Sequence, residues 1–163
     1  MNKPKLWLRL VALAVIAALV AMDQLVKVWA QGNLQGTGRQ VLLPGVLGLL
    51  YAENPGISFG MLGQNTTAML IVTVITGVIM LAGLVWMMLG RLETLSMWSA
   101  VLIIGGGLGN FIDRVAQGYV VDYIEFLFIQ FAIFNLADVF ITVGMVGLII
   151  ATIITERRKA RAA

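Results

Sequence analysis

The chain has 163 residues, of which 60% are hydrophobic and 12% are charged, with a formal net charge of +3 and a mean hydropathy of +0.97. Soluble domains are only about 45–50% apolar, so this composition excludes a water-soluble globular protein and predicts one integral membrane domain over residues 1–163. The sequence contains no cysteine and no histidine, which excludes disulfides, thiolate nucleophiles, the Ser-His-Asp triad and histidine zinc sites. Hydrolytic chemistry would need carboxylates, a Ser/Lys pair or a bound metal.

Four segments are long and apolar enough to cross a bilayer, which takes about 20 residues per helix. The expected spans are about residues 6–29, 66–89, 95–111 and 137–155. The first follows two lysines and so resembles a secretory signal peptide. Its apolar character nevertheless continues as far as Trp29, and no small-x-small cleavage site precedes a polar start. We therefore expect it to be retained as a membrane helix.

Basic residues mark one side of these spans, and such an asymmetry sets the orientation. They lie at the start of the first span, between the second and third, and after the fourth: Lys3, Lys5, Arg9, Arg91, Arg157, Arg158, Lys159 and Arg161. That side is predicted to be cytoplasmic and to carry both termini, with residues 30–65 and 112–136 on the outer side. Because the basic residues flank the membrane, the net charge does not indicate a nucleic-acid partner.

The first outer segment consists of short apolar runs interrupted by Pro44-Gly45 and Gly48. This pattern favours a small β element at about residues 39–54 over a helix. It is apolar enough that we expect it to lie on the membrane surface, as a platform for a membrane-borne substrate. The predicted fold class is an all-α membrane protein, a four-transmembrane-helix bundle with a small β element outside the membrane.

Two aspartates, Asp122 and Asp138, flank a short loop that leads into the last span. A carboxylate beside a bilayer is costly unless it is paired, hydrated or used. Asp138 by itself could be a helix N-cap, and Asp122 could be a plain loop acid. If they meet at one membrane surface, their repulsion raises the pKa of one of them, and the pair could act as acid and base.

Other polar residues lie at helical spacing. Asp23 and Lys27 are four residues apart and can pair on one face, which we interpret as a structural ion pair near the outer end of the first span. Asn110, Asp113 and Arg114 can also face one direction. They could form a hydrated helix end or a polar scaffold beside a reaction centre, where Arg114 would pair with Asp113 or hold a substrate carbonyl.

Two glycine-containing motifs have a structural and a functional interpretation. The run from Gly105 to Asn110 only weakly resembles a phosphate-binding loop, and Gly105 with Gly109 fits small-x-x-x-small packing in a membrane helix better. Asn54-Pro55-Gly56 is typical of a turn, although Asn54 could also bind a substrate backbone.

Together these residues resemble the lipoprotein signal peptidase family, or signal peptidase II, whose members are bacterial inner-membrane aspartyl proteases. The resemblance covers nearly the whole chain. Its blocks are Asp23-Gln24 with Lys27, Asn54-x-Gly56, Gly107-x-Gly109-Asn110-x-x-Asp113-Arg114, Val121-Asp122 and Phe134-Asn135-x-Ala137-Asp138.

The resemblance implies a catalytic pair at Asp122 and Asp138. It implies that Asn110, Arg114 and Asn135 line the site, and that the remaining residues of the blocks support it: Asn54, Gly56, Asp113, Asp23 and Lys27. The implied substrate is a diacylglyceryl-modified prolipoprotein, cut before its lipidated cysteine on the periplasmic side of the inner membrane, and the β element would be the family's periplasmic β-cradle. The implied partners are membrane lipid and globomycin-type inhibitors. No metal or other cofactor is implied, and we expect a monomer.

Two departures from the family pattern concern the surroundings of the site. The run Asn54-Pro55-Gly56-Ile57-Ser58-Phe59 replaces the more usual Asn-Thr-Gly-Ala-Ala-Phe, and the loop from Asp122 to Asp138 is short. Substrate contacts and gating are therefore expected to differ locally.

Three other functions remain open at this point. A Ser/Lys protease would use Ser58 and Lys27, since lysine can act as the base. A small proton-coupled transporter would use intramembrane acids, but there is no internal repeat and the acids lie near one surface. A non-catalytic assembly factor would leave the two aspartates unexplained.

Overall fold

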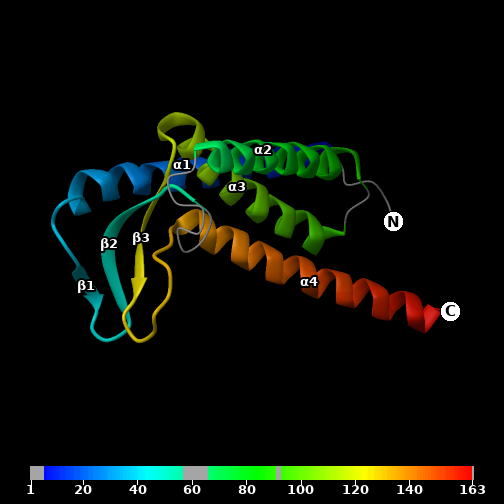
Figure 1. Cartoon of the computed structure of the whole chain (residues 1–163). Coiled ribbons are helices and arrows are strands. Elements are labelled where there is room, and N and C mark those ends of the chain that lie inside the picture. The colour runs from blue at the N-terminus through cyan, green and yellow to red at the C-terminus, as the bar shows by residue number, and fades with distance from the viewer. Residues whose placement is uncertain (1–5, 57–65, 91–92, 163) are drawn as a thin grey trace.

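The computed structural model describes residues 6–56, 66–90 and 93–162. The helices are α1 (Leu6–Leu34), α2 (Thr66–Leu89), α3 (Thr94–Gln117) and α4 (Leu136–Ala162). Strands β1 (Gln40–Leu43) and β2 (Leu47–Asn54) lie between α1 and α2, and β3 (Val120–Phe126) lies between α3 and α4. Each helix is long and apolar enough to cross a membrane. Figure 1 shows the helices running side by side from one end, with the sheet standing across the other end. The predicted fold class is confirmed.

The buried centre of the bundle is α3, which packs against α1, α2 and α4. In its most apolar stretch 56% of the residues are buried, against 6–17% in the other three helices. The outer faces of those three carry exposed aliphatic side chains such as Leu25, Val78 and Ile149. Such faces suit contact with lipid tails, since a helix that is hydrophobic all round must be buried in protein or membrane.

Glycines let the helices approach α3 closely. A Cβ on Gly105 would lie 2.9 Å from Leu19 of α1, and one on Gly144 of α4 would lie 2.7 Å from the Ser99 carbonyl oxygen. A Cβ on Gly106 would collide with the carbonyl oxygen of Ala137. The glycine run of α3 is therefore a packing surface inside a helix, as the small-x-x-x-small interpretation predicted.

The sheet is antiparallel, with strand order β1-β2-β3. A small β element was expected at about residues 39–54, and there β1 and β2 form a hairpin in which Gln40 pairs with Leu49. The third strand was not predicted. Asp122, which the sequence left as a possible loop acid, lies in β3, where it pairs with Ala52 of β2. The run of β-branched and aromatic residues that follows Gly118 was the available signal for a strand.

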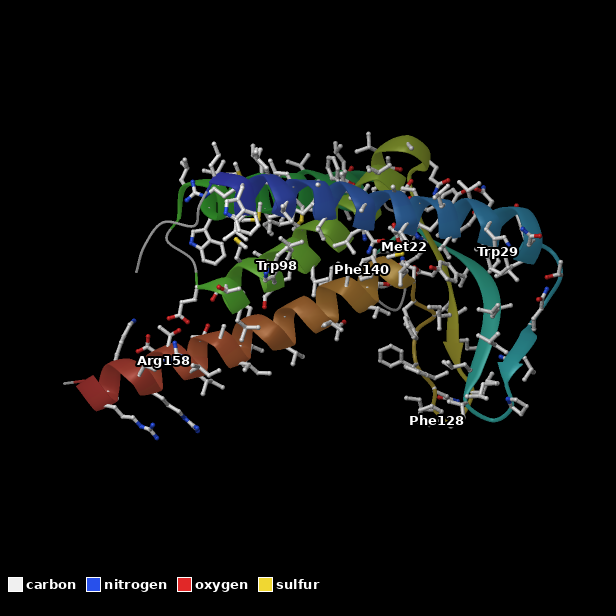
Figure 2. The ribbon with its side chains drawn as sticks, turned by 180° about the vertical axis from the view of Figure 1, so that it is seen from behind. Met22, Trp29, Trp98, Phe128, Phe140 and Arg158 are labelled. Carbon is white, nitrogen blue, oxygen red and sulfur yellow. The ribbon has the colours of Figure 1, made fainter. Side chains whose placement is uncertain are left out.

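The third helix is longer than expected and ends at Gln117, with Gly118 in a left-handed conformation (φ 80°) that the missing Cβ permits. Asn110, Asp113 and Arg114 therefore lie inside α3 and not beyond its end. Figure 2 shows Phe128 at the far tip of the sheet and Arg158 near the end of α4, at opposite ends of the molecule.

Candidate active site

Asp122 is held by two side-chain amides. Asn54, at the end of β2, donates from Nδ2 to Asp122 Oδ2 at 2.9 Å, and Asn135 Nδ2 donates to Asp122 Oδ1 at 2.7 Å. Asn54 is itself fixed because its Oδ1 accepts from the backbone N–H of Gly56 at 3.1 Å. Asp122 is only 3% exposed, so its carboxylate is oriented by protein groups and not by bulk water.

Asp138 belongs to the first turn of α4, and the N-cap of that helix is Asn135. The Asp138 N–H donates to Asn135 Oδ1 at 3.0 Å, and the Asn135 N–H donates to Asp138 Oδ2 at 3.1 Å. This is the reciprocal arrangement of a capping box. Asn110 Nδ2 donates to the other oxygen, Asp138 Oδ1, at 2.9 Å. The interpretation of Asp138 as an N-cap correctly placed it at the start of the last helix, but the N-cap residue is Asn135.

Asn135 joins the two aspartates. Its side-chain amide contacts Asp122 while its backbone contacts Asp138, and it is fully buried. The same Nδ2 also lies 3.1 Å from Asn110 Oδ1. The structure therefore brings together residues from β3, α3 and the start of α4 that the sequence separates by up to 28 positions.

The environment favours a proton on Asp122. Burial raises the pKa of Asp122 from 3.8 to about 6, and the negative charge of Asp138 acts in the same direction. The amide hydrogen bonds from Asn54 and Asn135 oppose this rise, because they stabilise the ionised carboxylate. A buried carboxyl beside a second carboxylate is the arrangement in which a pair can hold one proton between them.

A buried group of charges lies behind the two aspartates. Lys27 Nζ contacts Asp23 Oδ2 at 2.8 Å and Asp113 Oδ2 at 2.9 Å, and it donates to Asn110 Oδ1 at 2.8 Å. The predicted Asp23–Lys27 pair is present. The suggested pairing of Arg114 with Asp113 is wrong, since Asp113 bonds Lys27 and Arg114 instead donates to the backbone oxygens of Asn110 and Gly56.

The contacts of Lys27 with other described residues argue against a role as the base of a Ser/Lys protease. Its ammonium contacts two carboxylates and an amide oxygen, and the side chain is 3% exposed. With its nitrogen engaged by these three groups, Lys27 is poorly placed to take a proton from a serine hydroxyl. Ser58, the other member of the Ser/Lys alternative, lies outside the described residues.

A cavity of about 760 Å³ opens in front of Asp122 and Asp138. Its polar end is formed by the two aspartates with Asn54, Asn110 and Arg114. From there it continues between α2 and α4, with α3 as its floor. The apolar side chains along this part include Val72, Ile79, Met80, Ile103, Val139 and Val143.

Among the described residues, no group of three or more acidic, cysteine or histidine side chains is arranged to hold a metal ion.

Aromatic side chains form a wall of the cavity that was not predicted. Phe126, Phe131 and Phe134 all line it, and the Phe126 ring lies 5.0 Å from Phe134 and 5.8 Å from Phe131, centroid to centroid. The concentration of phenylalanines between the two aspartates in the sequence was the signal that could have revealed this wall.

The sequence is similar to those of known proteins along most of its length. The sequence model of a family described as signal peptidase (SPase) II matches residues 15–154. Proteins named lipoprotein signal peptidase from Streptococcus thermophilus (strain CNRZ 1066) and Clostridioides difficile (strain 630) are 42% and 38% identical to this chain over 147 and 144 residues. Each alignment covers 88% of this chain, and they cover 93% and 95% of the two relatives.

Two solved structures, each described as a bacterial membrane enzyme determined by the in meso method, have the same fold. Their TM-scores are 0.78 and 0.74, at 27% and 29% identity, and they cover 91% and 87% of this chain. The alignments extend over 91% and 92% of those chains. The resemblance drawn from the sequence is thereby confirmed, and the chain belongs to the signal peptidase II family of multi-pass bacterial membrane peptidases.

Proposed function

We propose that this protein is an aspartyl endopeptidase that removes the signal peptide from diacylglyceryl-modified prolipoproteins, cutting before the lipidated cysteine. The observation that carries the proposal is the position of Asp122 and Asp138. They share Asn135 as a hydrogen-bonding partner at the polar end of a cavity whose remainder is apolar. Family membership supplies the substrate class.

In the proposed mechanism the pair carries one proton. The ionised aspartate accepts a proton from a water molecule, which attacks the scissile carbonyl carbon, and the protonated aspartate donates a hydrogen bond to the developing oxyanion. That aspartate then helps to protonate the leaving amine. We assign the proton to Asp122, whose pKa is raised by burial, and the role of base to Asp138.

Asn110 and Arg114 have different parts in this proposal. Asn110 orients the base, because its Nδ2 donates to Asp138 Oδ1 while its Oδ1 is fixed by Lys27. Arg114 lines the cavity and donates only to backbone oxygens among the described residues. Its guanidinium can therefore hold a carbonyl oxygen of the bound peptide without leaving a buried partner unpaired.

The apolar part of the cavity suits a substrate that arrives through the membrane. It runs between α2 and α4, two helices whose outer faces are apolar. A hydrophobic signal segment could lie along this surface while its cleavage site reaches the aspartates. The basic end of α4, at Arg158, lies away from the sheet (Figure 2). By the positive-inside rule, we place this end and both termini in the cytoplasm and the two aspartates on the periplasmic side.

The direct test uses purified protein in detergent with a diacylglyceryl-modified prolipoprotein, with and without globomycin. We expect cleavage before the lipidated cysteine, inhibition by globomycin, and at least 100-fold slower cleavage by both Asp122→Asn and Asp138→Asn, since such residues typically contribute about 10²–10⁴-fold. Folding of each variant is checked by gel filtration and helix content. Well-folded wild-type protein that leaves the substrate intact would refute the assigned reaction, and a fully active aspartate variant would refute the mechanism.

A further inference from the structure

We propose that Asp23, Lys27 and Asp113 are positioning residues that set the separation of Asp122 and Asp138 by holding the backbone next to each of them. This inference rests on the proposed function of the two aspartates. None of the three residues lines the cavity, so each would act through the backbone and not on the substrate.

The key observation is where the two supporting carboxylates bind. Asp113 Oδ2 accepts from the backbone N–H of Val121 at 3.1 Å, and Asp23 Oδ1 accepts from the backbone N–H of Ala137 at 3.1 Å. Val121 and Ala137 are the residues immediately before Asp122 and Asp138. Each proposed catalytic residue is therefore preceded by a backbone group that is fixed to a buried carboxylate.

Lys27 couples these two attachments. Its ammonium contacts Asp23 at 2.8 Å and Asp113 at 2.9 Å, so a single nitrogen atom determines how far apart the two carboxylates lie. All three side chains are at most 3% exposed. Gln24 adds a further link, because its Nε2 donates to Asp113 Oδ1 at 2.9 Å and to Asp23 Oδ2 at 3.4 Å.

A glycine of α3 makes room for this arrangement. A Cβ on Gly109 would collide with Asp23 Oδ2, and Gln24 Nε2 donates to the Gly109 carbonyl oxygen at 3.1 Å. The absence of a side chain at Gly109 thus lets α1 bring its carboxylate to the start of α4. Replacing Gly109 would displace Asp23 without removing any polar group.

The carboxylate oxygens that make each contact allow a test of whether these residues act by positioning the backbone or only by supplying negative charge. At Asp113, Oδ2 contacts both Lys27 and the Val121 N–H, so the single oxygen of an asparagine could keep both of these contacts and would lose only the hydrogen bond that Oδ1 accepts from Gln24. At Asp23 the two tasks fall on different oxygens: Oδ2 contacts Lys27 and Oδ1 accepts from Ala137. An asparagine at Asp23 must place its NH₂ group against either the ammonium or the N–H of Ala137, and it loses one of the contacts.

The two variants therefore form a matched pair. Asp113→Asn and Asp23→Asn each remove one negative charge and leave Lys27 with one carboxylate. We expect Asp113→Asn to keep kcat within about tenfold of wild type. Asp23→Asn should lower kcat by about 100-fold, the scale of a 1 Å misplacement, with KM within about threefold because the cavity is unchanged. Glu93→Gln, which removes an acid at the other end of the bundle, should leave both constants unchanged.

The assay uses the lipidated prolipoprotein, at a temperature at which melting curves show every variant folded. Equal losses in Asp113→Asn and Asp23→Asn, or a loss that appears in KM alone, would overturn the inference while leaving the cleavage reaction itself established by the wild type. If Asp23→Asn does not fold, Gly109→Ala decides the matter, with Gly83→Ala as its control because a Cβ there meets Ile104 at an ordinary 3.4 Å. The inference requires Gly109→Ala to lower kcat and Gly83→Ala not to; equal activity of the two would contradict it.

Discussion

The side-chain amide of Asn135 donates to Asp122 Oδ1 at 2.7 Å, and this bond connects the last turn before α4 with the middle of β3. The same residue bonds Asp138 through its backbone. One buried amide thus fixes the relative position of two carboxylates that come from different elements. This makes Asn135 the residue whose loss should disturb the site most without removing either acid.

Asn135→Ala should reduce kcat by at least about 100-fold, because it removes the side chain that holds Asp122 at a fixed position relative to Asp138. It should also lower the free energy of unfolding by roughly 1–3 kcal/mol, because buried partners lose their hydrogen bonds. Asn33→Ala is the matched control, because Asn33 is exposed and, within the described residues, its side chain donates only to the Trp29 carbonyl oxygen of its own helix. Cleavage kinetics and thermal melting measure both effects, and kinetics close to those of the control would argue against the linking role of Asn135.

The activity should depend on pH through Asp122. Its pKa is raised to about 6, so the proton that the mechanism assigns to it is held below that pH and lost above it. We expect kcat/KM to fall as the pH rises beyond about 6, approaching tenfold per pH unit, because this ratio reports groups of the free enzyme. A pH profile of cleavage between pH 5 and 9 tests this, and a flat alkaline limb would show that Asp122 is not the proton donor.

The folding stability should also depend on pH through Asp122, and it should decrease as this residue ionises. Because the folded-state pKa of Asp122 lies above 3.8, the folded protein binds this proton more tightly than the unfolded chain. Stability is therefore greatest below the unfolded-state pKa and falls as the pH rises from about 4 to about 6. Asp122→Asn cannot ionise, so the Tm of the variant minus that of the wild type should increase across this interval and then level off. A difference that does not change with pH would contradict the shifted pKa.

A bulky side chain in the apolar part of the cavity should interfere with the substrate and not with the aspartates. Thr142 lines the cavity on α4, whereas Thr152 is exposed on the same helix outside it. Thr142→Trp should lower kcat/KM for a full prolipoprotein by about tenfold or more, mainly through KM, as expected when ground-state binding is removed. Thr152→Trp should behave as wild type. Equal kinetics of the two variants would exclude this cavity as the path of the signal segment.

Ser58→Ala distinguishes the aspartyl mechanism from the Ser/Lys alternative. Under the aspartyl mechanism the hydroxyl has no chemical step to perform, and cleavage should stay within about threefold of wild type, the ordinary scale of context effects and far below the 10²-fold loss of a catalytic group. The comparison is made with Asp122→Asn on the same substrate. Abolished cleavage in a folded Ser58→Ala variant would revive the alternative despite the buried state of Lys27.

The sequence predicted the features of the fold that depend on residues close together in the chain. Hydropathy indicated the four helices, the Pro44-Gly45 turn indicated the hairpin, and the spacing of Asp23 and Lys27 indicated their contact. The contact of Lys27 with Asp113 joins residues 86 positions apart, and no periodicity encodes it. Strand β3 was missed for a related reason, because Asp122 and Glu125 interrupt its apolar run and its pairing partner β2 lies far away in sequence.

The capping box of Asn135 and Asp138 links activity to the state of a single helical turn. The hydrogen bonds that start α4 are made by the same atoms that orient Asp138 for its proposed role. The same turn is also held by Asp23 of α1, which accepts from the Ala137 N–H, so it opens only when the contacts around the site are lost. Such an opening would separate the two aspartates while the four helices still stand in the bilayer, so a loss of activity on heating reports the packing around the site and not the helical content.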